Sequence, residues 1–506
     1  MPHILIRQDT VDPADKRFYF KKADGVTGTT HGLAATPDYS NLTWHDRIVG
    51  DAVTNSDPSF IGYRLNSINF FKGRLALLSD TNVILSESGV YWNFFNVLST
   101  SVLDSDVIDV APSGERVSVL RSMVGYADRL ILMSDQTQFA LVGSPLVTPK
   151  TVSITPVSDF EMVRTCEPIR SATSLFFAFK RGDYTGVREM FVTNTLDMAF
   201  NSIDLTETIP AYISGEAKMI AASTHEDIVC ISTGDNKLYI YNYDHQGQQR
   251  TKSAWSVFTF SCDEILSISF IDSVLYMVVR RGSSIFIEKM NLTSGLKDSN
   301  ADYVVTLDRR YEILASDTVR VVYNATTDQS TITIPYGTEA GVETVVTDQK
   351  GYIYSPQQHD VGTSVIIVEG DVTAVDLWIG ERYMMKYKFS PPTMKRRNQA
   401  GQTMEHVTGR HQLRYGTILY RDSSHFTVNI TPDYGTTSVY TFTGKDLGSN
   451  TAILGSNAKS SGEFRFPIFS KSDRVSVEIQ NNSPLPSKFV SAEFEALYVS
   501  RRQGRY

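Results

Sequence analysis

An internal repeat constrains the fold of this chain of 506 residues more than any other feature of its sequence. The word RLALLSD at Arg74–Asp80 returns as RLILMSD at Arg129–Asp135. Weaker echoes begin at Ser174, Asp227 and Ser273, so that five units follow one another at intervals of 45 to 55 residues. A polar turn and a second apolar stretch follow each unit: Asn82–Leu85, Gln138–Val142, Val187–Val192, Lys237–Tyr241 and Ser284–Glu288.

A period of about 40 to 50 residues that contains paired strands is typical of the blades of a β-propeller. Each unit predicts an inner hairpin, and the less regular sequence between units supplies the outer strands. The short apolar runs are rich in β-branched and aromatic residues, and few stretches have a helical period. The fold class that we predict is all-β, a β-propeller of about six or seven blades with additional β regions; a flat stack of β-meanders is the alternative.

Composition limits the function classes that the chain can belong to. Hydrophobic residues make up 41% and charged residues 21%, which is typical of a folded chain. No window approaches 18 uninterrupted apolar residues, so no membrane insertion is predicted, and the first residues lack a signal-peptide pattern. The net charge of −8 argues against a tight, extended nucleic-acid binder but allows transient contact with DNA.

The sequence pattern changes near Leu296, which predicts three regions. Residues 1–295 would hold the propeller blades and an N-terminal approach segment. Alternating stretches at Val319–Tyr323 and Ser330–Pro335 predict a separate, inserted β region over residues 296–380. Residues 381–506 would form a C-terminal β region that could complete the propeller and dock partners.

A basic segment at Gly380–Arg421 is the main candidate for a functional site. It holds nine Lys or Arg residues against two acids in a chain that is acidic overall. Three interpretations stand: contact with phosphates in a channel, contact with a neighbouring subunit or partner, and a merely solvated loop. The residues chosen as candidate DNA or partner contacts are Lys395, Arg396, Arg397, Arg410 and Arg414.

Catalytic and cofactor motifs are missing from the sequence. It has no phosphate-binding P-loop, no H-E-x-x-H, no G-x-S-x-G and no C-x-x-C, and we predict no enzyme, no cofactor and no metal. Asp104, Asp106 and Asp109 could meet a divalent cation, but a solvated turn or an intersubunit salt bridge explains them better. The repeated Asp80 and Asp135 could be paired glycosidase carboxylates, but their place after a strand favours turns.

The histidines and cysteines are interpreted as structural. His406 and His411 lack the spacing of a metal site, which favours surface or interface histidines. Cys166, Cys230 and Cys262 lie far apart in apolar, strand-like contexts, so they predict buried free thiols.

An ordered series of words resembles the tail tubular protein B, or nozzle, family of podophages. The words cover both ends of the chain. They are Met1–Arg7, Trp44, Arg47–Asp51, Asn55–Gly62, Asn66–Leu75, Asn82–Ser86, Trp92–Phe95, Asp104–Val110, Tyr387–Ser390, Gly409–Arg414, Gly462–Pro467 and Glu495–Arg502.

The resemblance implies a structural subunit of the virion tail. Such a subunit assembles as a homohexamer ring below the adaptor ring protein, carries a narrow nozzle assigned to residues 296–380, docks tail fibres and lets double-stranded DNA pass. In the family the first word lies inside a longer chain, after a platform region. The chain is therefore expected to be a C-terminal portion of the family's protein, or the N-terminal part is encoded or processed separately. The alternative functions are a propeller-type polysaccharide hydrolase and a glycan-binding tail protein.

Overall fold

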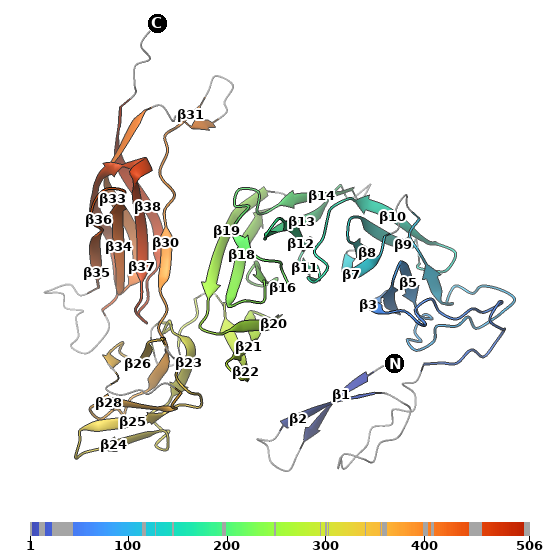
Figure 1. Cartoon of the computed structure of the whole chain (residues 1–506), viewed down its shortest axis with the longest axis horizontal. Helices are drawn as coiled ribbons and strands as arrows, with labels where there is room; N and C mark the ends of the chain where they lie inside the picture. Colours follow the sequence, from blue (N-terminus) through green and yellow to red (C-terminus); the bar gives the residue numbers. More distant parts are fainter. Residues whose placement is uncertain are drawn as a thin grey trace, which may run out of the picture. The chain divides into compact units, whose positions relative to one another are not determined.

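The computed structural model divides the chain into two compact units, Met1–Thr293 and Ser294–Tyr506 (Figure 1). Within the described residues it contains strands and a single three-residue 3-10 helix, η2 (Ser472–Arg474), and no helix there has the length and hydropathy to cross a membrane. The structure describes residues 3–9, 16–22, 44–113, 118–126, 128–143, 146–194, 199–246, 249–293, 295–298, 301, 303–339, 341–354, 356, 362–397, 403–405, 409–444 and 458–499. The predicted all-β class is confirmed.

Five antiparallel sheets follow one another along the first unit. In each of them the strands are hydrogen-bonded in chain order, as in a meander. The first two sheets are β3 (Leu65–Phe71), β4 (Arg74–Ser79), β5 (Asn82–Leu85), β6 (Ile108–Val110), and β7 (Leu120–Tyr126), β8 (Arg129–Ser134), β9 (Gln138–Gly143), β10 (Val152–Ser158). The third is β11 (Ile169–Ser171), β12 (Ser174–Arg181), β13 (Tyr184–Asn194), β14 (Ala199–Asp204), with β15 (Ile213–Ser214) also paired to β13. The fourth and fifth are β16 (Met219–Ser223), β17 (Ile228–Ser232), β18 (Lys237–Gln246), β19 (Gln249–Thr259), and β20 (Glu264–Ile271), β21 (Val274–Arg281), β22 (Ser284–Asn291).

The five hairpins predicted from the repeat are all present. They are the second and third strands of the five sheets: β4–β5, β8–β9, β12–β13, β17–β18 and β21–β22. The repeated words coincide with the most buried strands; every residue of β4 is buried, for example. The sequence repeats because each sheet contains an inner strand that is largely buried and must therefore be apolar.

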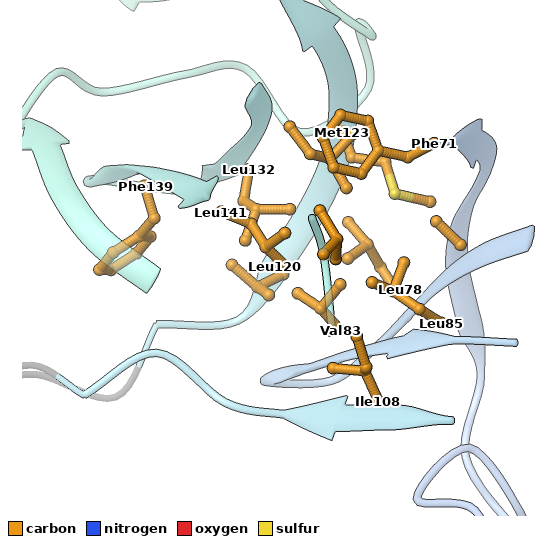
Figure 2. Packing of buried hydrophobic residues seen from close by; sticks show 13 residues of the cluster. Phe71, Leu78, Val83, Leu85, Ile108, Leu120, Met123, Leu132, Phe139 and Leu141 are labelled. Atoms are coloured by element: carbon orange, nitrogen blue, oxygen red, sulfur yellow. The ribbon is translucent and has the colours of Figure 1, made fainter. Parts of the chain in front are cut away.

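Each sheet packs its face on the next sheet through a separate hydrophobic cluster. Leu78 and Leu85 of the first sheet meet Leu120, Leu132 and their neighbours in the second (Figure 2). Further clusters join the second sheet to the third, the third to the fourth and the fourth to the fifth. The first strands of successive sheets also contact one another, β3 with β7, β7 with β11, β11 with β16 and β16 with β20.

This packing is the arrangement of propeller blades: the second, third and fourth sheets are each covered on both faces by their neighbours, and the first strands of successive sheets lie together at the inner side. Five of the predicted six or seven blades are thus present as sheets within residues 65–291. The outer face of the first sheet is covered instead by aromatic side chains, because Trp44, Phe60 and Phe94 pack on Leu75, Leu77 and Ile84. A separate two-stranded sheet, β1 (His3–Asp9) with β2 (Lys16–Lys22), precedes the blades in the chain.

The second unit contains two β-sandwiches. One sheet of the first sandwich has the order β23 (Asp308–Ile313), β29 (Leu377–Glu381), β26 (Thr344–Asp348), β27 (Ile353–Tyr354). Its other sheet has the order β24 (Val321–Asn324), β25 (Gln329–Thr333), β28 (Val365–Glu369). Buried residues such as Ile332, Val346 and Ile379 lie between the two sheets. One sheet of the second sandwich has the order β30 (Met385–Lys388), β37 (Val475–Asn481), β34 (His425–Pro432), β35 (Ser438–Thr443). Its other sheet has the order β36 (Ser460–Lys471), β33 (Arg410–Ser423), β38 (Phe489–Val499). Ile418, Phe426 and Phe466 lie between these two sheets. A short hairpin, β31 (Lys395–Arg397) with β32 (Thr403–Glu405), stands apart from both.

Candidate functional site

The predicted basic site lies on a hairpin and at the beginning of a long strand of the second unit. Lys395, Arg396 and Arg397 form β31, where Lys395 is opposite Glu405 in the register of β32. Arg410 and Arg414 belong to β33, and both are exposed. The structure thus places the five residues on β31 and on β33, with β32 between them in the chain.

Two contacts of one carbonyl group fix the base of this hairpin to the second sandwich. The carbonyl oxygen of Pro392 accepts a hydrogen bond from the Ser472 hydroxyl and lies 2.9 Å from Nδ1 of His411. His411 is half-buried and is held by this contact, whereas His406 lies outside the described residues. The tether keeps Lys395 close to the end of the sandwich where β33 begins.

Strand β38 ends at the same end of the sandwich. Arg410 lies opposite Val499 in the β33–β38 register, so the basic start of β33 and the last described residues of the chain are neighbours. Residues Arg501, Arg502 and Arg505 follow directly in the sequence. We name Lys395, Arg396, Arg397, Arg410 and Arg414 the basic end.

Two other basic residues of the segment lie near acidic residues that are distant in the sequence. Arg382 lies 3.3 Å from Glu343, and Lys388 is opposite Glu478 in the register of β30 and β37. In contrast, Arg410 and Arg414 make no ion pair with a residue that the structure describes. Uncompensated exposed guanidinium groups can bind an anionic partner, because they retain all their charge-assisted hydrogen bonds for it.

The acidic cluster near Asp106 serves to anchor a loop. The Asp106 carboxylate is fully buried and accepts a hydrogen bond of 2.7 Å from the backbone N–H of Leu103. The guanidinium of Arg74, itself 2% exposed, donates to the carbonyl oxygens of Ser86, Asp104 and Asp106 at 2.6 to 2.8 Å. Burial lowers the pKa of Arg74 from its usual value, and the Asp106 charge opposes this shift. Asp104 and Asp109 are exposed, as a solvated turn predicts, whereas Asp106 is a buried, hydrogen-bonded anchor of the loop.

The third carboxylate of that cluster and the two repeated aspartates have separate structural roles. Asp109 accepts hydrogen bonds from the hydroxyl of Ser59 at 2.8 Å and from the side-chain amide of Asn82 at 2.7 Å. Asp80 has a φ of 49°, as the predicted tight turn requires. Asp135 instead lies between Arg121, at 3.1 Å, and Arg164, at 2.8 Å. No group of three or more potential metal ligands occurs in the described part of the chain.

A shallow cavity of about 260 Å³ opens beside the first blade and is lined by Asp57, Asn96 and Asp109, among others. Its carboxylates already have partners: Asp57 pairs with Arg47, and Asp109 binds Ser59 and Asn82. The lining therefore offers no uncompensated acid or base for chemistry.

The cysteine prediction is confirmed. Cys166, Cys230 and Cys262 are buried free thiols. Burial raises the pKa of the Cys166 thiol to about 12, and it raises that of Cys230 as well. Neither thiol is a nucleophile at neutral pH, because the reactive species is the thiolate.

Sequence reasoning missed a buried ionic network between the third and fourth sheets. Glu189 is 1% exposed; its carboxylate pairs with Arg250, accepts a hydrogen bond of 2.6 Å from the Ser174 hydroxyl and lies 3.5 Å from Nε2 of His245. The sequence carries one signal for it. Glu189 stands two residues after Val187 in a strand, so both side chains point to the same buried face.

The fold and the candidate site together define a structural β protein of blade-like sheets and sandwiches with a positively charged end. The family model described as "Bacteriophage nozzle protein" matches residues 1–505, so the chain belongs to that family. The family predicted from the sequence words is thereby confirmed, and with it the assignment to the phage tail.

Known proteins show how far the similarity extends. The chain is 28% identical over 479 residues to "Tail tubular protein gp12" of Escherichia phage T7, a match that covers 92% of this chain and 60% of that relative. The chain therefore spans less than two thirds of the relative's length.

Solved structures show only a distant likeness. The β-propeller domain of Cps50 (Swd1) from Myceliophteria thermophila has a TM-score of 0.30 at 7% identity, covering 45% of this chain and 73% of that one. The Pan2 WD40 domain of Neurospora crassa has a TM-score of 0.28 at 8% identity, covering 64% and 91%. The assignment of blades here depends on the sheet order and packing described above.

Proposed function

We propose that this chain is a non-enzymatic channel subunit of a short phage tail. In this proposal identical copies form a homohexamer ring on the adaptor ring protein, double-stranded DNA passes through the ring during ejection, and the ring supports the tail fibres. The observation that carries the proposal is the family match over residues 1–505. The relative's name, a tail tubular protein, supports the same role.

Charge is consistent with a conduit. A net charge of −8 keeps the subunit from holding a phosphate backbone tightly, which a channel for moving DNA requires. Residues 296–380 are proposed as the nozzle-like region, and the basic end as a contact with a neighbouring subunit or tail protein. Arg410 and Arg414 support this assignment of the basic end, because both are exposed and neither makes an ion pair within the described part of the chain.

Cryo-electron microscopy of the virion tail, with this sequence fitted to the density, tests the proposal. We expect a ring of copies around an axial channel below the portal. Density on a fibre or spike away from the axis would refute the channel function. A reducing-sugar assay on host surface polysaccharide tests the non-enzymatic assignment, which predicts no release above a buffer control.

A further inference from the structure

The last blade is one strand short. The first four sheets of the described part of unit 1 have at least four strands, whereas the fifth consists of β20, β21 and β22 alone. The third strands of the other sheets are deeply buried, for example β9 and β5. No residue of β22 is classed as buried, and Ile285 and Ile287 are 64% and 77% exposed.

The free edge of β22 has hydrogen-bonding groups to offer. Gly282 has a φ of 57° and is the first residue of the two-residue turn between Arg281 and Ser284, which fixes these two as a hydrogen-bonded pair. By the alternation of an antiparallel ladder, the backbone amides of Ile285, Ile287 and Lys289 point away from β21. An exposed strand edge of this kind is a template for a further strand.

The chain also contains a sheet that is too small to stand alone. Among the described residues β1 pairs only with β2, and an isolated two-stranded hairpin is at best marginally stable in water. Its sequence has strong β-formers at the centre of both strands, Ile4-Leu5-Ile6 and Phe18-Tyr19-Phe20. This hairpin needs a sheet to extend, and β22 is a sheet edge that lacks a strand.

Chain length permits the two to meet within one molecule. Residues 23–43 separate β2 from Trp44, which packs on the first sheet. A linker of this length spans up to about 70 Å when extended, more than the width of a small domain. The hairpin can therefore reach the last blade while residue 44 remains on the first.

We propose that the β1–β2 hairpin adds to the free edge of β22 and supplies the strand that the fifth blade lacks. The contact ties the beginning of the first unit to its last blade, so that the row of blades is held at both ends. The segment that pairs with the free edge of β22 is the β1–β2 hairpin of the same molecule. A strand of the Ser294–Tyr506 unit and the hairpin of a second copy are the competing occupants.

Hydrogen exchange followed by mass spectrometry on the full chain tests this proposal. Ile6→Pro removes a backbone N–H from the middle of β1, and Ile6→Val is the matched control that keeps the strand. We expect the amides of residues 284–291 to exchange at least about tenfold faster in I6P than in I6V, and β17 to stay protected in both. Fast exchange of 284–291 in both variants would overturn the proposal, and so would equal protection, because another segment would then cover the edge.

A reciprocal variant separates the remaining outcomes. Ile287→Pro removes an amide from the free edge and no bond to β21, so peptides from residues 3–9 and 16–22 should lose protection in it. Unchanged exchange there would contradict the pairing. Protection of 284–291 that rises with protein concentration would identify a second copy as the occupant and reject the intramolecular contact.

Discussion

At the scale of single residues, buried charge in this protein joins one sheet to the next. Glu189 comes from the third sheet and its partners Arg250 and His245 from the fourth. Tyr243 of the fourth sheet donates a hydrogen bond of 2.7 Å to the Ser171 hydroxyl of the third. Both contacts cross a junction that also contains a large hydrophobic cluster, and these directional polar contacts help to fix how the two sheets are aligned.

Replacement of Glu189 by Gln should lower the free energy of unfolding by about 3 kcal/mol, because Arg250 then keeps a partly buried charge without its counter-ion. The matched control is Glu495→Gln. Glu495 pairs with Arg465 at 2.8 Å, but both side chains are 57% exposed, and the expected loss is below about 1 kcal/mol. Urea unfolding of the two variants measures the difference, and equal losses would contradict a structural role for the buried pair.

Tyr243 predicts a pH dependence of stability. Burial raises the pKa of Tyr243 to about 12, and the hydrogen bond to Ser171 opposes this shift. Because the folded-state pKa lies above the unfolded value of about 10, the stabilisation is complete below pH 10 and is lost as pH rises toward 12. Tyr243→Phe should therefore be less stable than the native chain at pH 8, by about 1 kcal/mol for the lost hydrogen bond. The difference should shrink above pH 10 in denaturant titrations; a constant difference from pH 8 to 11 would show that Tyr243 ionises normally.

At the scale of elements, the sequence predicts the inner strands better than the edges. In the first four sheets the second and third strands are largely buried and so appear as continuous apolar words. The fourth strands are less apolar because they lie at a sheet edge; β10, for example, alternates between exposed and half-buried residues. Such strands have weak patterns and were predicted only as irregular sequence between units.

The candidate site was predictable as a charge excess but not as a set of partners. The count of basic residues located the segment Gly380–Arg421. The pairing of Arg382 with Glu343 depends on which strands become neighbours, and so does the binding of Pro392 to Ser472. These residues are far apart in the sequence, so spacing carries no information about them.

Two strand glycines allow a matched test of packing inside the blades. Gly186 of β13 lies directly opposite Phe179 of β12, and a Cβ there would come within 2.2 Å of the Phe179 ring. Gly125 of β7 has nothing within 4 Å of the same position. Gly186→Ala should cost about 1–3 kcal/mol through overpacking, whereas Gly125→Ala should be neutral or slightly stabilising. Thermal melts of both variants decide this; equal melting temperatures would mean that the Phe179 ring moves aside freely.

At the scale of the whole molecule, assembly should depend on a template. Copies that each carry a net charge of −8 repel one another, and a stable ring contact needs about 1,200 Å² or more of well-packed interface. We therefore expect the isolated chain to be monomeric at micromolar concentration and to form a ring only on the adaptor ring protein. Sedimentation velocity with and without the adaptor measures this, and a ring from the chain alone would contradict it.

The basic end gives that prediction a residue-level test. The double variant Arg410→Glu with Arg414→Glu should weaken assembly on the adaptor by at least about tenfold, because it turns an attractive charged contact into a repulsive one. Lys386→Glu with Lys388→Glu is the matched control, with the same change in charge on β30 of the same sandwich. If both variants weaken assembly equally, net charge is responsible and the basic end is no specific contact. Assembly at the native level in R410E/R414E would remove the basic end from the interface and leave two interpretations, a contact with phosphates in the channel and a merely solvated loop.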